Sequence, residues 1–213
     1  VYEYSKDVTH VDGVWNLKGS AGDMPTSSQN QTAEGAGRSV DMNGDGTLIV
    51  ISSYQYDIVG ESNNGRVLVY LWGGTNWSLI DNATAIVGED GDSIGNTGIA
   101  INKSAGWDTD RTTRLAVPFT FGDLDPNSNP NDNRGIVRVY ELTGYTWSLL
   151  GSPIYGSGAG SNVYDVALNS DGSRLAFTEV FGAKVRIFDY NSTTNNWDEI
   201  TTVPNNMIGR DCL

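Results

Sequence analysis

Short runs of alternating apolar and polar residues, separated by turn residues, recur along the whole chain. Four segments share one form, in which an apolar strand and a polar turn are followed by a tryptophan that opens a second strand. They are Val1–Tyr4 with Trp15, Val69–Trp72 with Trp77, Val139–Leu142 with Trp147, and Ile187–Tyr190 with Trp197. Alternation with period two is typical of a strand with one buried face, so each segment predicts an antiparallel hairpin.

A second hairpin precedes three of these four segments. The runs Asn43–Gly46 and Asn169–Gly172 each place Asp-Gly between two apolar stretches, where glycine accepts the positive φ of a tight turn. The middle copy has a longer turn, from Lys103 to Thr113. Two consecutive hairpins in every ~50–70 residues predict four-stranded antiparallel blades of a β-propeller, with strands A to D. The phased tryptophans, and the series Tyr70, Tyr140 and Phe188, are then expected to pack between blades.

The repeat predicts an all-β chain that forms a single propeller segment over residues 1–213, with about three and a half blades. Residues 1–20 would supply strands C and D of a partial blade. Full blades would cover 36–81, 98–151 and 163–200, and 209–213 would begin the next blade. Because an incomplete ring leaves open sheet edges, we expect a ring of about six to eight blades. The rest of the ring would come from the same chain or from another one.

The repeat units resemble a known class of propeller sequences. Residues 165–177, 184–190 and Trp197 are similar to FG-GAP-like or kelch-like repeats, in particular those of large secreted or surface proteins of single-celled algae. The resemblance extends over nearly the whole chain. It implies a propeller fold, and roles in adhesion, scaffolding and sometimes catalysis.

Charge and composition exclude several classes of function. The net charge is −13 and the pI about 4.2, so the chain should be repelled by phosphate backbones, and we expect no nucleic-acid partner. No apolar run approaches the ~18 residues of a membrane span, so no membrane insertion is expected. With one cysteine, Cys212, and one histidine, His10, neither a zinc site of the CxxC type nor a Ser-His-Asp or Cys-His set can be assembled.

Loop lengths point to one face of the propeller. The B–C connections run from Ser52 to Arg66 and from Pro118 to Gly135, and a D–A connection runs from Asp81 to Thr97. Loops longer than about 12 residues are uncommon unless they are functional or disordered, and these connections emerge on the same face. They carry eight carboxylates that we expect to gather on one rim, as candidates for contacting a partner or calcium. These are Asp57, Glu61, Glu89, Asp90, Asp92, Asp123, Asp125 and Asp132. The alternative is that these acids cap turns in solvated loops. Trp107 on the opposite face is a further candidate contact.

A weaker candidate for calcium lies in the first Asp-Gly turn. Asp41, Asn43 and Asp45 alternate oxygen ligands as calcium loops do. The later carboxylate of such loops is replaced here by Ile49, and the other two blades place Ala100 and Ala167 at the position of Asp41. Ordinary turn chemistry is therefore favoured, and we expect no cofactor, with calcium as the alternative.

Five Asn-X-Ser/Thr sequences fall in expected loops, turns or strand ends, and they favour an extracellular or cell-surface location. They begin at Asn30, Asn76, Asn82, Asn102 and Asn191. Together these features favour a non-catalytic interaction or structural module of a surface assembly, which binds a protein or glycan through its face loops. Two alternatives stay open: a glycan-acting hydrolase or lyase that uses paired rim carboxylates, and an intracellular propeller scaffold.

Overall fold

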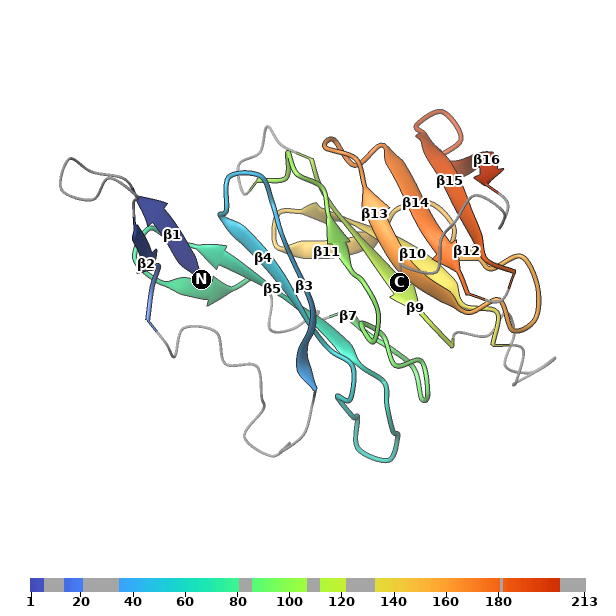
Figure 1. Cartoon of the computed structure of the whole chain (residues 1–213), viewed down its shortest axis with the longest axis horizontal. Coiled ribbons are helices and arrows are strands. Elements are labelled where there is room, and N and C mark those ends of the chain that lie inside the picture. The colour runs from blue at the N-terminus through green and yellow to red at the C-terminus, as the bar shows by residue number, and fades with distance from the viewer. Residues whose placement is uncertain are drawn as a thin grey trace.

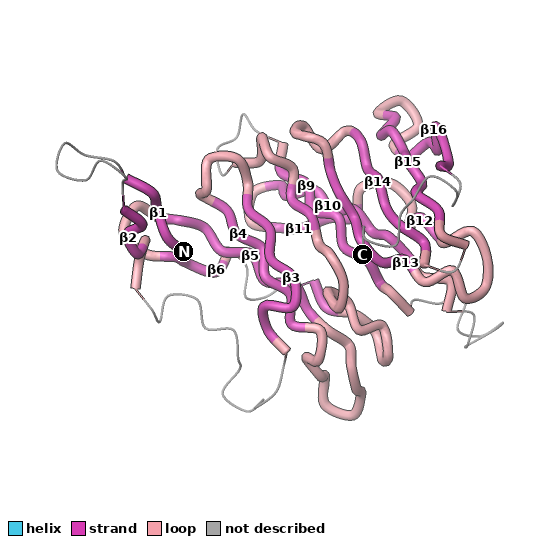
Figure 2. The backbone as a smooth tube through the Cα atoms, viewed as in Figure 1, coloured by secondary structure: helices cyan, strands magenta, loops and turns pink. Residues whose placement is uncertain are grey.

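The chain forms a row of antiparallel sheets, as a computed structural model of the protein shows (Figure 1). The structure describes residues 1–5, 14–20, 35–80, 86–106, 112–121, 133–180 and 182–203. Within these ranges every regular element is a strand, and the backbone trace alternates strands with loops throughout (Figure 2). The predicted all-β architecture of four-stranded antiparallel blades is confirmed.

Three blades follow a short N-terminal hairpin. The hairpin pairs β1 (Tyr2–Ser5) with β2 (Val14–Leu17). The first blade has the order β3-β4-β5-β6, the second β8-β9-β10-β11, and the third β13-β14-β15-β16. Two short strands, β7 and β12, pair with the first two residues of β5 and of β10. The blade strands are β3 (Ala36–Met42), β4 (Leu48–Ser53), β5 (Arg66–Trp72), β6 (Trp77–Leu79), β7 (Ile86–Val87), β8 (Ala100–Ile101), β9 (Thr113–Phe119), β10 (Ile136–Thr143), β11 (Thr146–Leu149), β12 (Ile154–Tyr155), β13 (Val163–Leu168), β14 (Arg174–Glu179), β15 (Lys184–Asn191) and β16 (Asn196–Val203).

The apolar cores lie between neighbouring sheets, because the apolar face of one blade is shielded from water only when another blade packs against it. One cluster joins the first blade to the second, for example Val50 and Val69 with Leu115 and Phe119. A second cluster joins the second blade to the third, and a third lies on the face of the first blade that is turned away from the second.

The repeating aromatic residues whose side chains the structure describes lie in these clusters; Trp15 is outside that set. Tyr70, Trp77, Phe188 and Trp197 are buried, and Tyr140 and Trp147 pack partly buried against the first cluster. Burial raises the pKa of Tyr140 above its ordinary value, with Asp92 adding to the effect and Arg138 opposing it.

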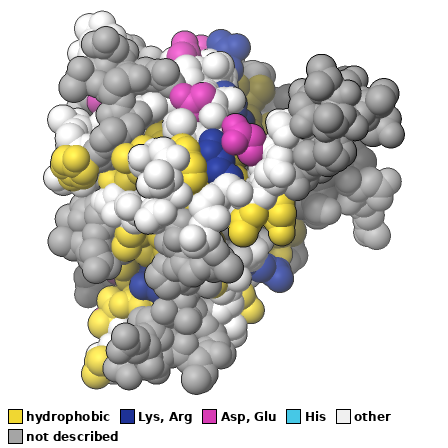
Figure 3. Space-filling view, turned by 90° about the vertical axis from the view of Figure 1, so that its left-hand side faces the viewer, with side chains coloured by type: hydrophobic (Ala, Val, Ile, Leu, Met, Phe, Trp, Pro, Cys, Tyr) yellow, Lys and Arg dark blue, Asp and Glu magenta, His cyan; other side chains and the backbone are white. Residues whose placement is uncertain are grey.

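The N-terminal hairpin covers only part of its end of the molecule. Trp77 donates its indole N–H to the carbonyl of Lys18 (3.0 Å), which ties the hairpin to the first blade. Tyr2, Tyr4 and Leu17 nevertheless stay exposed, and the view of that end shows hydrophobic side chains at the surface (Figure 3).

Candidate functional site

The most elaborate surface of the described chain is built by two loops of the first blade, residues 54–65 between β4 and β5 and residues 88–97 after β7. We call these two loops the rim. Backbone hydrogen bonds join them along their length: Gly91 donates to Ser62 (2.9 Å), Ser93 to Asn63 (2.7 Å) and Ile94 to Asn64 (3.1 Å). Gly65 forms a parallel bridge with Ile94. The two loops are therefore fixed to each other, although they are distant in sequence.

Five of the eight candidate carboxylates lie on the rim, and four of them, Asp57, Glu61, Asp90 and Asp92, accept hydrogen bonds within it. Asp57 accepts the N–H of Asn63 (2.5 Å) and Asp90 that of Ser62 (2.9 Å), while Asp92 accepts the N–H of Glu89 (2.7 Å). Glu61 accepts the side-chain amide of Asn64. These contacts are the turn-capping chemistry that was the alternative to a binding role. Glu61, Glu89 and Asp90 also remain exposed, so the rim keeps negative charge at its surface.

Asn64 is the centre of the rim, and the sequence analysis did not single it out. Its side chain is fully buried, accepts the N–H of Ile58 (3.0 Å) and donates to the carbonyl of Gly88 (3.2 Å). Asn63 beside it has a φ of 54°. The run Asn63-Asn64-Gly65 could have indicated a turn held by side-chain hydrogen bonds, since Asn and Gly favour positive φ and Asn side chains bond to the backbone of turns.

The rim ends in an apolar tip made of Ile58 and Val59. The Glu61 N–H donates to the carbonyl of Ile58 (2.9 Å), and Gly60 has a φ of 93°, so residues 58–61 form a tight turn that favours glycine at its third position. Val59 at the second position is 102% exposed, and Ile58 is 40% exposed. A fixed turn thus projects an aliphatic side chain between carboxylates.

The remaining partner-binding candidates cannot be placed. Asp123, Asp125, Asp132 and Trp107 lie outside the described residues. The gathering of eight carboxylates on one face therefore stays a prediction for these three acids.

On the opposite face, the oxygens of the weak calcium candidate are engaged with the protein. Asp41 accepts from Lys103 Nζ (2.5 Å) and from the N–H of Ile101 (3.0 Å) of the second blade. Asn43 is buried and accepts the N–H groups of Thr47 and Leu48, both at 2.9 Å. Asp45 accepts the hydroxyl of Thr47 (2.5 Å). This is the geometry of a turn capped by side chains, and no group of three or more His, Cys, Asp or Glu in the described ranges is placed to hold a metal ion.

The candidate glycosylation sites differ in their surroundings. Asn76 is exposed in the turn before β6, and Asn191 is half-buried, with its amide donating to Asp198 (2.8 Å). Asn102 is fully buried and donates to the carbonyl of Thr112 (2.9 Å), so a glycan there is incompatible with the folded chain and we withdraw that site. Asn30 and Asn82 lie outside the described residues.

A buried ion pair of the third blade binds the loop that arrives from the second blade. The side chain of Glu179 has no exposed surface; it accepts from Arg186 (3.1 Å) and from the N–H of Ser157 (2.9 Å) in the loop after β12. Burial by itself lowers the pKa of Arg186, but hydrogen bonds and charge from Glu199 and Glu179 outweigh it and raise the pKa above its ordinary value. The arginine therefore stays charged, and the pair holds the loop onto the third blade.

No helix in the described ranges is long and apolar enough to cross a membrane.

Comparison with known proteins gives only distant structural matches and leaves the activity open. No protein-family model matches the sequence, and no curated protein matches it. Solved structures do match. One from Bacteroides uniformis, described as a "putative 6-phosphogluconolactonase", has 14% identity and a TM-score of 0.48 over 78% of this chain and 40% of its own. A second of the same description, from Bacteroides fragilis, has 12% identity and a TM-score of 0.37 over 79% of this chain and 56% of its own. The chain thus spans about half the length of these structures.

Two expectations are corrected by these matches. The neighbours are β-propeller-type proteins, but they do not support FG-GAP-like or kelch-like repeats specifically. The expectation that the chain is not an enzyme is also withdrawn: two of the matched structures carry an enzyme's name, which at 12–14% identity assigns no activity to this chain. That expectation rested partly on there being a single histidine and a single cysteine, and neither residue is required for acid–base chemistry by carboxylates.

Proposed function

We propose that the rim of the first blade is a binding surface for a protein segment that combines basic side chains with aliphatic ones. The observation that supports this most directly is Val59, which a hydrogen-bonded turn holds fully in solvent two residues before the exposed carboxylate of Glu61. An exposed aliphatic residue on a turn contributes nothing to the core, whereas a partner that covers it gains the free energy of its burial.

Rigidity strengthens the proposal. The bonds between residues 62–64 and 90–94, and the buried Asn64 amide, fix the loop before any partner arrives. A pre-ordered loop loses less conformational entropy on binding than a free one, so a small contact area can suffice for measurable affinity.

The charge of the rim specifies the partner. Glu61, Glu89 and Asp90 remain exposed, and the chain as a whole carries −13. A basic segment would be steered to this surface, and its affinity should fall as salt screens the charges. The proposal concerns recognition, and it holds whether the segment is a partner or a substrate of a complete propeller.

The test uses a synthetic peptide of alternating lysine and leucine, with an alternating glutamate and leucine peptide of equal length as the charge control. Fluorescence polarisation should show binding of the lysine peptide alone. Val59→Ser should weaken it by about tenfold, on the scale of one buried aliphatic side chain. Equal binding of both peptides would contradict the proposal.

A second variant separates charge from the apolar tip. The double change Glu61→Gln and Asp90→Asn keeps the hydrogen-bond acceptors but removes two charges, and it should weaken binding by a few-fold and flatten its salt dependence. The matched control is Asp171→Asn, on an exposed turn of the third blade. If this control weakens binding as much as the rim variant, net charge and not the rim is responsible.

We also propose a cell-surface or extracellular location, which the exposed sequon at Asn76 supports. Intact-mass measurement of native protein should show a glycan that Asn76→Gln removes. A native mass without any glycan would contradict it.

A further inference from the structure

The third blade leaves open a face that is covered in the first two. For each blade, we call the face turned toward the next blade its leading face. Register identifies the equivalent positions: Val50 pairs with Val69, Ala116 with Val139, and Ala176 with Ile187. Val67, Val137 and Val185 lie two residues before the second member of each pair.

One further position belongs to the set. The third residue after the blade tryptophan is Ile80, Leu150 and Ile200 in the three blades. Ile80 and Leu150 are 5% and 8% exposed, because the next blade covers them, whereas Ile200 is 48% exposed. The leading face of the third blade therefore keeps the apolar pattern of a covered face, and no described part of the chain covers Ile200 as the next blade covers Ile80 and Leu150.

Polar contacts between blades also repeat, and the last set is incomplete. Trp77 donates its indole N–H to Lys18, and Trp197 donates to Leu150 (2.9 Å); each acceptor is the third residue after the preceding tryptophan. By the same rule the acceptor for a following blade is the carbonyl of Ile200.

The A–B turns follow a similar pattern. The Gly44 N–H donates to the carbonyl of Lys103 in the next blade (2.7 Å), and the Ser104 N–H donates to Ser170 (2.8 Å). In each case a turn is bonded to the turn of the blade that follows. The turn of the third blade, which begins at Asn169, occupies the equivalent position and is exposed.

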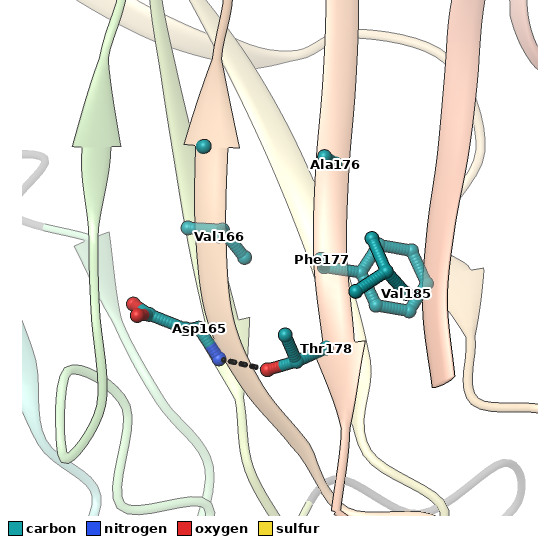
Figure 4. A pocket seen from close by; sticks show the side chains of 7 residues that line it. Asp165, Val166, Ala176, Phe177, Thr178 and Val185 are labelled. Atoms are coloured by element: carbon teal, nitrogen blue, oxygen red, sulfur yellow. Dashed lines mark hydrogen bonds between the residues drawn. The ribbon is translucent and has the colours of Figure 1, made fainter. Parts of the chain in front are cut away.

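Small residues leave a hollow on the third blade. Ala167, Ala176 and Val185 line a depression of about 150 Å³ with Asp165, Thr178 and their neighbours (Figure 4). In the second blade the equivalent alanines, Ala100 and Ala116, are buried in one cluster with Phe177 and Phe188 of the third. Large side chains from a following blade would fill the hollow in the same way.

We infer that the leading face of the third blade receives a further propeller blade of the same repeat, whose nearest relative in this chain is the third blade itself. The second blade offers Ala116, Val137, Val139 and Leu150 to the third, and the third offers Ala176, Val185, Ile187 and Ile200. The two sets differ only by exchanges of similar volume, which packed interfaces tolerate best. A blade that presents the large side chains of the third blade therefore fits both.

The test extends the chain by one blade. Residues 151–213 are placed a second time after Val203, and Cys212→Ser is introduced so that Ile200→Cys in the first copy supplies the only thiol. The thiol of the unextended protein should react with iodoacetamide at the rate of an exposed cysteine. In the extended protein it should react about tenfold more slowly, since opening of the interface must precede reaction.

Two controls separate coverage from other effects. Val40→Cys, on exposed β3, should react equally in both proteins. Replacing the tryptophan of the added blade by phenylalanine should restore part of the reactivity at Ile200→Cys, because it removes the indole bond to the carbonyl there.

Three results would overturn the inference. The thiol could react equally fast in both proteins, or the added segment could stay sensitive to protease beside a native third blade. The unextended protein could also be a dimer by sedimentation that Ile200→Asp dissociates, with the thiol protected only in the dimer. That last result would assign the face to a second copy of the chain.

Discussion

The second and third blades carry the same repeat, yet their sheets differ in burial on one face. All but one residue of β9 is buried, since blades lie on both sides of it, whereas β14 alternates between buried and partly exposed positions. The sequences of the two strands are similarly apolar, Arg114–Val117 beside Arg174–Phe177. The contrast shows that the apolar pattern of a strand indicates which face of its sheet can be buried. Whether that face is buried depends on the presence of a neighbouring blade.

The largest effect is expected at Leu150 and its equivalent Ile200. Leu150→Ala should lower the free energy of unfolding by about 2–4 kcal/mol because it leaves a cavity between blades. Ile200→Ala should cost less than about 1 kcal/mol, since its side chain is half exposed. Urea denaturation of both variants measures the difference. Equal losses would mean that the third blade is covered in solution.

Two ion pairs of the third blade sharpen the same contrast. Glu179→Gln should cost about 2–3 kcal/mol, because it removes charge from a buried acceptor that holds Arg186 and Ser157. Asp189→Asn alters the exposed pair with Arg174 (2.6 Å), which lowers the pKa of Asp189. That change should leave the midpoint unaltered at neutral pH. The midpoint of thermal unfolding measures both changes. A larger drop in the midpoint for Asp189→Asn than for Glu179→Gln would mean that the face carrying Asp189, and not the face carrying Glu179, is the covered face of the third blade.

The smallest difference between equivalent positions of two blades is expected in the A–B turns. Asn43 bonds to its own turn and also donates to the carbonyl of Ala105 in the next blade (2.8 Å), so Asn43→Ala should cost about 1–2 kcal/mol. Asn169 makes the same local bond, to the N–H of Arg174 (2.9 Å), but is exposed. Asn169→Ala should cost about half as much, measured by the same denaturation. If both cost the same, the contact with the next blade contributes nothing.

The blades and their turns were predictable because each depends on residues close in sequence. Asp171 shows this: Ser173, two residues away, donates through both its N–H (2.9 Å) and its hydroxyl (2.6 Å), and these bonds lower the pKa of Asp171. The Asp-Gly turn therefore carries its own stabilisation.

The rim was predictable only in outline. Loop length indicated where it would lie, but the fixing of the two loops to each other depends on bonds between residues distant in sequence, such as Ser62 with Asp90 and Asn64 with Gly88. Four of the proposed contact acids, Asp57, Glu61, Asp90 and Asp92, are acceptors within the loops for the same reason: a carboxylate accepts whichever N–H the fold places beside it.

The sequence by itself determined the strands, their pairing into blades and the turn chemistry, since these follow from period-two patterning and local hydrogen bonds. Only the tertiary structure decided which apolar faces are covered, which carboxylates cap loops, and which sequon is buried at Asn102. Burial depends on the blade alongside, and no pattern within one strand specifies whether that blade is present.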